Sequence, residues 1–202
     1  MNSKSGYMYM AAMCSLFIVA PGRFASGLVL IIGLALFTVT GTLFCHFLKF
    51  IKMNEMKSVL LIGFIVFMVM LYRQILILTM PSLALSMSFI LFLAAISTYV
   101  ISFMFTPEEN SLSVDLKKNS LHIAKVSVYG FFVSLVRDVF GYGTFTFISF
   151  NGVIEKVIFP EEKISLMSFI ASIPGGFILC ALILVVYMLI LKKIDVIKRA
   201  GL

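Results

Sequence analysis

The residues best able to do chemistry lie in one short stretch of the second half of the chain. Arg137 and Asp138 are adjacent there, and Gly141, Gly143 and Thr144 follow them inside an otherwise apolar run. A charged side chain in hydrocarbon costs at least ~2.5 kcal/mol on insertion scales, so such charges usually face a bundle interior and mark a functional site. Non-helical backbone at membrane depth must also be covered by protein or by a water-filled cavity. We therefore expect a broken helix at the centre of the protein.

Cysteine is the second residue type in this chain that could do chemistry. Cys14, Cys45 and Cys180 each lie inside an apolar segment, and no two of them have C-x-x-C spacing. This pattern argues against a disulfide framework and against a self-contained zinc site. A single cysteine in an apolar segment is most often a small packing residue. The sequence alone therefore does not decide whether each thiol packs in the core or binds a metal.

The composition is that of an integral membrane protein. Of the 202 residues 61% are hydrophobic and 12% are charged, and the mean hydropathy is +1.13. Soluble domains carry roughly 25% charged residues. The chain has no segment long enough to be a domain linker, so residues 1–202 are predicted to form a single transmembrane bundle. The net charge of +7 does not indicate nucleic acid, because the basic residues cluster at the ends of apolar runs, where membrane lipid headgroups are met.

Six apolar segments are expected to cross or enter the membrane. They cover residues 7–20, 25–48, 58–80, 83–105, 123–140 and 164–191. The first would reach only ~21 Å as a helix, short of a ~30 Å hydrocarbon core, so it either spans imperfectly or is re-entrant. The stretch 106–120 is predicted to be an aqueous loop. The expected fold is an all-α membrane protein whose six segments form a 3+3 inverted repeat with short or broken helices, one half at about 7–80 and the other at about 83–191.

The distribution of basic residues predicts the orientation of the chain. With six crossings, eleven Lys and Arg residues lie on the side of the two termini, whereas Arg23, Lys156 and Lys163 lie on the other side. Cytoplasmic loops carry the excess of basic residues. Both termini are therefore expected in the cytoplasm.

Counting residues along each predicted helix gives the depth of its polar positions. Cys14 lies seven residues, ~10 Å, from the cytoplasmic end of its segment, and Ser97 lies eight residues, ~12 Å, from that of its own. Arg73 and Asp138 each lie fifteen residues, ~22 Å, from the start of their segments, so they are predicted to pair. Arg137 and Asp138 are sequence neighbours and point in different directions on a helix, so they are not expected to pair.

Three short motifs resemble one known family in the same order along the chain. Residues 137–145 (RDVFGYGTF) resemble the Arg-Glu-x-x-Gly-x-Gly-Thr-Leu signature of the E subunit of Rnf electron-transport complexes and of the D subunit of sodium-pumping NADH:quinone oxidoreductase (Nqr). Residues 13–16 (MCSL) resemble that family's Leu-Cys-Pro/Ser-x-Leu, and residues 174–178 (PGGFI) its Pro-Gly-Ala-Phe-Ile. Chain length and segment number also agree, so the resemblance covers nearly the whole chain.

The resemblance implies a subunit that does not act as an enzyme by itself. In that family two paralogous six-helix subunits of the bacterial inner membrane share a buried 2Fe–2S cluster, work with flavin-bearing subunits and couple electron transfer to Na⁺ or H⁺ movement. Cys14 matches the first cluster ligand, and Ser97 stands where the family has the second cysteine. Iron–sulfur clusters favour thiolate over hydroxyl ligands. The ligand set is therefore either altered or completed by Cys45 or Cys180.

Two other interpretations remain open from the sequence. The first is a small inverted-repeat transporter without metal, in which the broken helices line a substrate site. The second is a degenerate subunit that keeps the scaffold and serves only in assembly of such a redox complex.

Overall fold

The computed structural model describes residues 16–53, 55–104, 111–149, 152–158 and 169–199. In order along the chain, these residues form a helical turn at 16–19, the helices α2 (Phe24–Phe50), α3 (Lys57–Thr79), α4 (Pro81–Met104) and α5 (Leu112–Arg137), the short π-helix η1 (Asp138–Tyr142), the strands β1 (Thr144–Ser149) and β2 (Gly152–Val157), and helix α7 (Ile173–Arg199).

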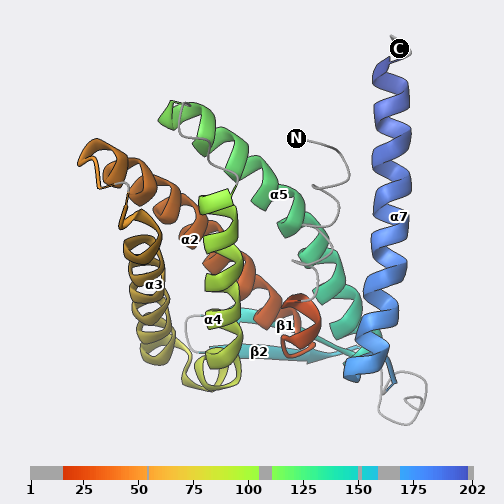
Figure 1. The fold of residues 1–202 in the computed structure, drawn as a ribbon. Coiled ribbons are helices and arrows are strands. Elements are labelled where there is room, and N and C mark those ends of the chain that lie inside the picture. Colours follow the sequence, from red (N-terminus) through yellow and green to blue (C-terminus); the bar gives the residue numbers. More distant parts are fainter. Residues whose placement is uncertain (1–15, 54, 105–110, 150–151, 159–168, 200–202) are drawn as a thin grey trace.

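Helix α2 lies at the centre of the bundle and packs against α3, α4 and α5 (Figure 1). Small residues allow these close contacts. A Cβ atom on Gly33 would lie 3.1 Å from the Tyr72 ring of α3, and the Tyr72 hydroxyl donates a 2.8 Å hydrogen bond to the carbonyl oxygen of Val29. Helices α2, α3 and α4 begin and end within a few residues of the predicted segments, so the predicted bounds of these three helices are confirmed.

Helix α5 begins earlier than the sequence predicted. It starts at Leu112, inside the stretch that was predicted to be an aqueous loop, so that prediction is wrong for residues 112–120. The polar residues Asp115 and Asn119 are buried against α2 rather than exposed to water. A polar sequence forms a helix here because its polar side chains have polar partners on α2.

A β-hairpin follows the break at the end of α5. Strands β1 and β2 pair antiparallel, with Thr144 opposite Val157 and Ser149 opposite Gly152. The hairpin crosses one end of the helix bundle, at the bottom of Figure 1. The segments predicted from the sequence left residues 141–163 without an assigned element, so this hairpin was not predicted. Asn151-Gly152 between two alternating runs is a hairpin signal in the sequence, but it would place the turn one residue late, because Gly152 is paired with Ser149 as the first residue of β2.

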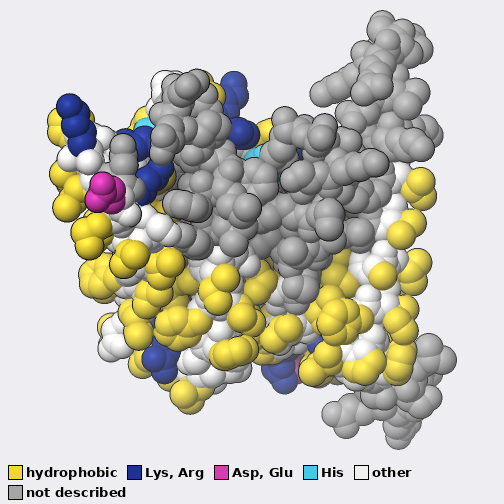
Figure 2. All heavy atoms as spheres, in the orientation of Figure 1, with side chains coloured by type: hydrophobic (Ala, Val, Ile, Leu, Met, Phe, Trp, Pro, Cys, Tyr) yellow, Lys and Arg dark blue, Asp and Glu magenta, His cyan; other side chains and the backbone are white. Residues whose placement is uncertain are grey.

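The surface has the pattern of a protein embedded in lipid. Hydrophobic side chains form a broad band over the visible face, and Lys and Arg gather mainly at its upper edge (Figure 2). Among the described residues, three helices are long and apolar enough to cross a membrane, namely α2, α3 and residues 81–98 of α4. These helices are compatible with a multi-pass membrane protein. The six crossings and the inverted repeat stay predictions.

Candidate functional site

The guanidinium group of Arg137 lies at the point where three distant parts of the chain meet. It is 3% exposed, and its Nη1 atom donates to the carbonyl oxygens of Ile18 at 2.8 Å and Ala20 at 2.9 Å, with a longer contact of 3.4 Å to that of Phe17. Its Nη2 atom donates to the carbonyl oxygen of Ala171 at 3.0 Å, just before α7. Arg137 therefore joins the N-terminal turn, α5 and the start of α7.

Carbonyl groups at a helix end explain why a cation is buried there. The last carbonyl oxygens of a helix have no partner within the helix and carry partial negative charge. In the described part of the chain, the hydrogen-bond partners of the Arg137 guanidinium are all backbone carbonyl oxygens, and no carboxylate is among them. Arg137 thus satisfies acceptors that would otherwise be orphaned next to hydrocarbon, and its role at this place is to fix the backbone.

Glycine residues make room for the guanidinium group. A Cβ atom on Gly22 would lie 2.8 Å from Arg137 Nε, and one on Gly176 would lie 3.4 Å from Arg137 Cζ. The first distance is shorter than real Cβ contacts, so a side chain at Gly22 would displace Arg137. The Pro-Gly-Gly sequence of α7 is therefore in contact with the Arg-Asp motif, although the two are more than thirty residues apart in sequence.

Asp138 is fully buried and faces the hairpin. One carboxylate oxygen accepts from the Thr146 backbone N–H at 2.7 Å and from its hydroxyl at 2.8 Å, and the other accepts from the Thr144 hydroxyl at 3.1 Å. The Thr146 hydroxyl in turn accepts from the N–H of Ala25 in the first turn of α2 at 3.2 Å. Hydrogen bonds to the charged form make a buried carboxylate tolerable. As expected, Arg137 and Asp138 point to different partners.

The predicted break of the helix occurs at the two glycines of the motif. The α-helix gives way to one turn of π-helix at Asp138–Tyr142, and Gly143 then takes the left-handed conformation with φ +65°. Gly141 packs closely on the backbone of Ala171, since a Cβ atom there would lie 3.0 Å from the Ala171 nitrogen. The two glycines therefore have different functions: Gly143 permits the turn into β1, and Gly141 permits the approach of the segment before α7.

The predicted pairing of Arg73 with Asp138 is wrong. Arg73 Nε donates to Ser88 Oγ of the adjacent α4 at 3.0 Å, whereas the Asp138 carboxylate is occupied by Thr144 and Thr146. Among the ion pairs of the described residues, none joins these two side chains. Depth along a helix does not determine which face a side chain occupies, and α5 begins eleven residues before the start assumed for the prediction.

The cysteines are not gathered into one place in the described part of the chain. Cys14 lies outside the described residues. Cys45 is fully buried in α2, ~32 Å along the helix from its start. Cys180 lies in the second turn of α7, at the hairpin end of the bundle. The Sγ and the carbonyl oxygen of Cys180 are each 2.7 Å from the Tyr129 hydroxyl. Ser97 donates to the carbonyl oxygen of Leu93 at 3.2 Å. Among the described residues no three His, Cys, Asp or Glu side chains are grouped as a metal site would need.

The sequence analysis missed a polar cluster between α2 and α5. His46 Nε2 lies 3.0 Å from an Asp115 carboxylate oxygen, and Asn119 donates from its side-chain nitrogen to Thr42 Oγ1 at 3.0 Å. The Asn119 side-chain oxygen has no partner among the described groups. The spacing of Thr42 and His46, four residues apart on α2, matches that of Asp115 and Asn119 on α5, and this shared spacing was the available signal.

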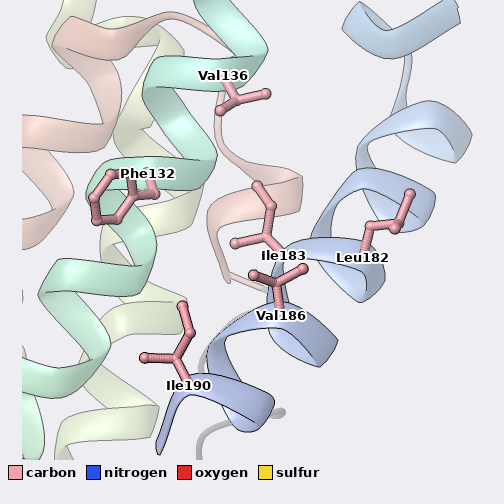
Figure 3. A pocket seen from close by; sticks show the side chains of 6 residues that line it. All are labelled: Phe132, Val136, Leu182, Ile183, Val186 and Ile190. Atoms are coloured by element: carbon pink, nitrogen blue, oxygen red, sulfur yellow. The ribbon is translucent and has the colours of Figure 1, made fainter.

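A purely apolar groove lies between α5 and α7. Its volume is about 340 Å³, and Figure 3 labels the side chains that line it, Phe132 and Val136 of α5 and four aliphatic residues of α7. The α7 residues are Leu182, Ile183, Val186 and Ile190. Such a lining suits hydrocarbon and offers nothing to a charged solute.

Comparison with protein-family models, curated proteins and solved structures gives no match for this chain.

Proposed function

We propose that the protein is the membrane subunit of a redox-driven ion pump of the Rnf/Nqr type, working beside a paralogous six-helix subunit and flavin-bearing subunits in the bacterial inner membrane. One observation carries the proposal. The motifs at 137–145 and 174–178, which resemble the family, meet around the Arg137 guanidinium, and the turn at 16–19, directly after the third motif, meets them there. Motifs that were matched independently along the chain thus belong to one spatial unit.

The contact gives Arg137 a definite role in this function. Its hydrogen bonds hold the carbonyl oxygens of Ile18 and Ala20, which follow Cys14 by four and six residues. Outer groups that orient a metal-ligating residue affect metal affinity strongly. Under this proposal Arg137 is a positioning residue for the segment that carries the candidate ligand.

The donor set of this chain does not by itself fit an iron–sulfur cluster. Cys45 and Cys180 lie near opposite ends of the bundle, and the Ser97 hydroxyl is bonded within its own helix. A cluster needs four ligands, usually thiolates. Under this proposal Cys14 is the ligand from this chain, and the remaining thiolates come from the partner subunit.

The test is purification of the tagged full-length chain from its native membranes in mild detergent. We expect a second six-helix subunit by mass spectrometry, together with bound iron and visible absorption. Cys14→Ala should remove iron and absorption, whereas Cys45→Ala, the matched control with a buried thiol, should retain both. A wild-type complex without iron overturns the redox assignment.

A subunit that serves only in assembly is the second candidate, and the position of Ser97 favours it. Its hydroxyl replaces the second cysteine and is bonded to Leu93. This candidate predicts the same partner subunits, but Cys14→Ala would leave their electron transfer unchanged. Electron transfer measured in the Cys14→Ala complex therefore distinguishes the two candidates.

A further inference from the structure

The side chain of Arg73 is a cation without an anionic partner in the described part of the chain. Its Nε atom donates to Ser88 Oγ of α4 at 3.0 Å, and the Ser88 hydroxyl in turn donates to the carbonyl oxygen of Ala84 at 2.9 Å. Among the described residues, neither ion pair includes Arg73, and no hydrogen bond joins its Nη1 or Nη2 atom to another group. The two terminal nitrogens of the guanidinium group are therefore donors that still need an acceptor.

This cation lies inside an apolar part of the bundle. Arg73 is six residues, ~9 Å, from the last residue of α3, and Ser88 is seven residues, ~10 Å, from the first residue of α4. The exposed side chains of α3 near Arg73 include Leu71, Ile75 and Leu78. An arginine near a helix end often extends to the lipid headgroups, but the bond to Ser88 holds this guanidinium beside α4. A headgroup at the membrane surface is therefore a poor match for it.

An apolar groove continues from Arg73 along the two helices. Its volume is about 310 Å³, and it is lined by three residues each of α3 and α4: Ile62, Ile65, Val66, Phe92, Ala95 and Ile96. Val66 and Arg73 are seven residues apart on α3, a spacing that places both on one helix face. Ser88 and Phe92 share a face of α4 in the same way, because they are four residues apart. The groove and the guanidinium group thus form one surface, apolar along most of its length and cationic at one end.

The chemistry of this surface specifies what covers it. Helix α3 packs mainly against α2 and α4 and lies at the left edge of the bundle in Figure 1. Ionisable side chains inside a membrane usually pair with one another, because an unpaired charge in hydrocarbon is costly. The terminal nitrogens of an arginine match the two oxygens of a carboxylate. An apolar partner with one carboxylate therefore complements the groove and Arg73 together.

This chain does not supply that carboxylate itself. Of its nine acidic residues, only Asp138 lies inside an apolar run of the sequence. The Asp138 carboxylate already accepts from Thr144 and Thr146. A second copy of the chain would offer the same set of acidic residues, so the partner is a different protein.

We propose that the α3–α4 face binds a transmembrane helix of a different membrane protein, and that an Asp or Glu side chain of this helix pairs with Arg73. The groove receives apolar side chains of the partner helix, and the ion pair fixes its register. Helices without the carboxylate are rejected, because they would leave the Arg73 charge unpaired. This inference does not depend on the redox function, since the contact needs no cofactor.

The test uses the full-length tagged chain in its native membranes. The photoreactive amino acid p-benzoylphenylalanine replaces Phe92, which lines the groove. Phe67 is the matched control position, because it is exposed and points about 100° away from Val66 on the same helix. After irradiation, mass spectrometry identifies the cross-linked peptide. We expect the probe at position 92, but not the probe at position 67, to join an apolar peptide that contains Asp or Glu.

Variants of Arg73 then test the ion pair. Arg73→Met and Arg73→Glu should each reduce the cross-link at least about tenfold, as loss of one member of a buried charge pair does. In the Arg73→Glu background, Arg in place of the partner helix's acidic residue should restore the cross-link. Gln74→Met is the matched control, because Gln74 is exposed at the same depth on another face of α3, and it should leave the cross-link unchanged.

Each result decides the proposal. Lipid adducts alone at position 92, a cross-link to a second copy of this chain, or a cross-linked peptide without a carboxylate overturns it. A cross-link of unchanged yield in both Arg73 variants also overturns it, as does failure of the exchanged charges to restore the cross-link. Thermal unfolding of each purified variant shows whether the fold is kept, and Arg73→Met keeps the test valid where Arg73→Glu fails to fold.

Discussion

Arg137 donates a 2.8 Å hydrogen bond to the carbonyl oxygen of Ile18, which lies 119 residues earlier in the chain. The contact links the first described turn to the helix break of the second half. It also explains why a charge can be buried without a carboxylate beside it. The contribution of this hydrogen bond to the stability of the fold can be measured directly.

Replacing Arg137 should destabilise the fold strongly. Arg137→Met removes several hydrogen bonds from a charged donor, each worth about 1.5–3 kcal/mol, and leaves buried carbonyl oxygens unpaired. Arg137→Lys keeps the charge but loses the planar fork, so an intermediate loss is expected. Thermal unfolding in detergent measures both. Arg73→Met, which loses one hydrogen bond at a half-buried site, is the control, and an equal effect of the two Met variants would contradict the assigned role.

Asp138 should tolerate Asn better than Leu. In Asp138→Asn the amide oxygen can still accept from Thr146, and the amide nitrogen can donate to the Thr144 hydroxyl, which turns to accept. Asp138→Leu leaves the Thr146 N–H buried without an acceptor, at a cost of about 1–3 kcal/mol. Unfolding temperatures of both variants test the difference, and a Leu variant as stable as the Asn variant would refute it.

Gly130 should not accept even a methyl group. A Cβ atom there would overlap the Phe17 ring, so Gly130→Ala is expected to cost on the order of 1–3 kcal/mol by overpacking. Phe17→Leu added to it should restore part of the loss. Gly63→Ala is the control, since no atom lies within 4 Å of its added Cβ, and it should be neutral or stabilising. Additive losses in the double variant would show that the two residues do not touch.

Gly143 should be replaceable by Asn at lower cost than by Ala. Its φ of +65° is left-handed, which costs residues with a Cβ atom roughly 1–2 kcal/mol, less for Asn. The order of stability Gly, Asn, Ala is the expected result of thermal unfolding. Equal stability of the three would mean that the turn does not need this conformation.

The parts of the fold that depend on local pattern could be predicted from the sequence. Helices α2, α3 and α4 are long apolar runs bounded by Pro or Lys, and the break was predicted from the closely spaced Gly141 and Gly143 after a charged pair. The sequence patterns of these elements are clear because they do not depend on contacts with the rest of the chain.

The parts that depend on tertiary partners could not be predicted in the same way. The start of α5 is polar in sequence, yet Asp115 and Asn119 are buried because they face His46 and Thr42 of α2. The partner of Asp138 was misjudged for the same reason, since depth says nothing about direction and the hairpin that supplies Thr146 was unknown. The buried Arg137 was recognised as important, but its backbone partners carry no signal in sequence.

The reach of these contacts also has a consequence for the order in which the protein can mature. The N–H of Ala25 and the carbonyl oxygens of Ile18 and Ala20 find their partners only in residues 137–146. Until residues 137–146 have been synthesised, these groups lack the partners that they have in the folded protein. The N-terminal turn and the first turn of α2 therefore reach their final contacts only after more than two thirds of the chain has been made.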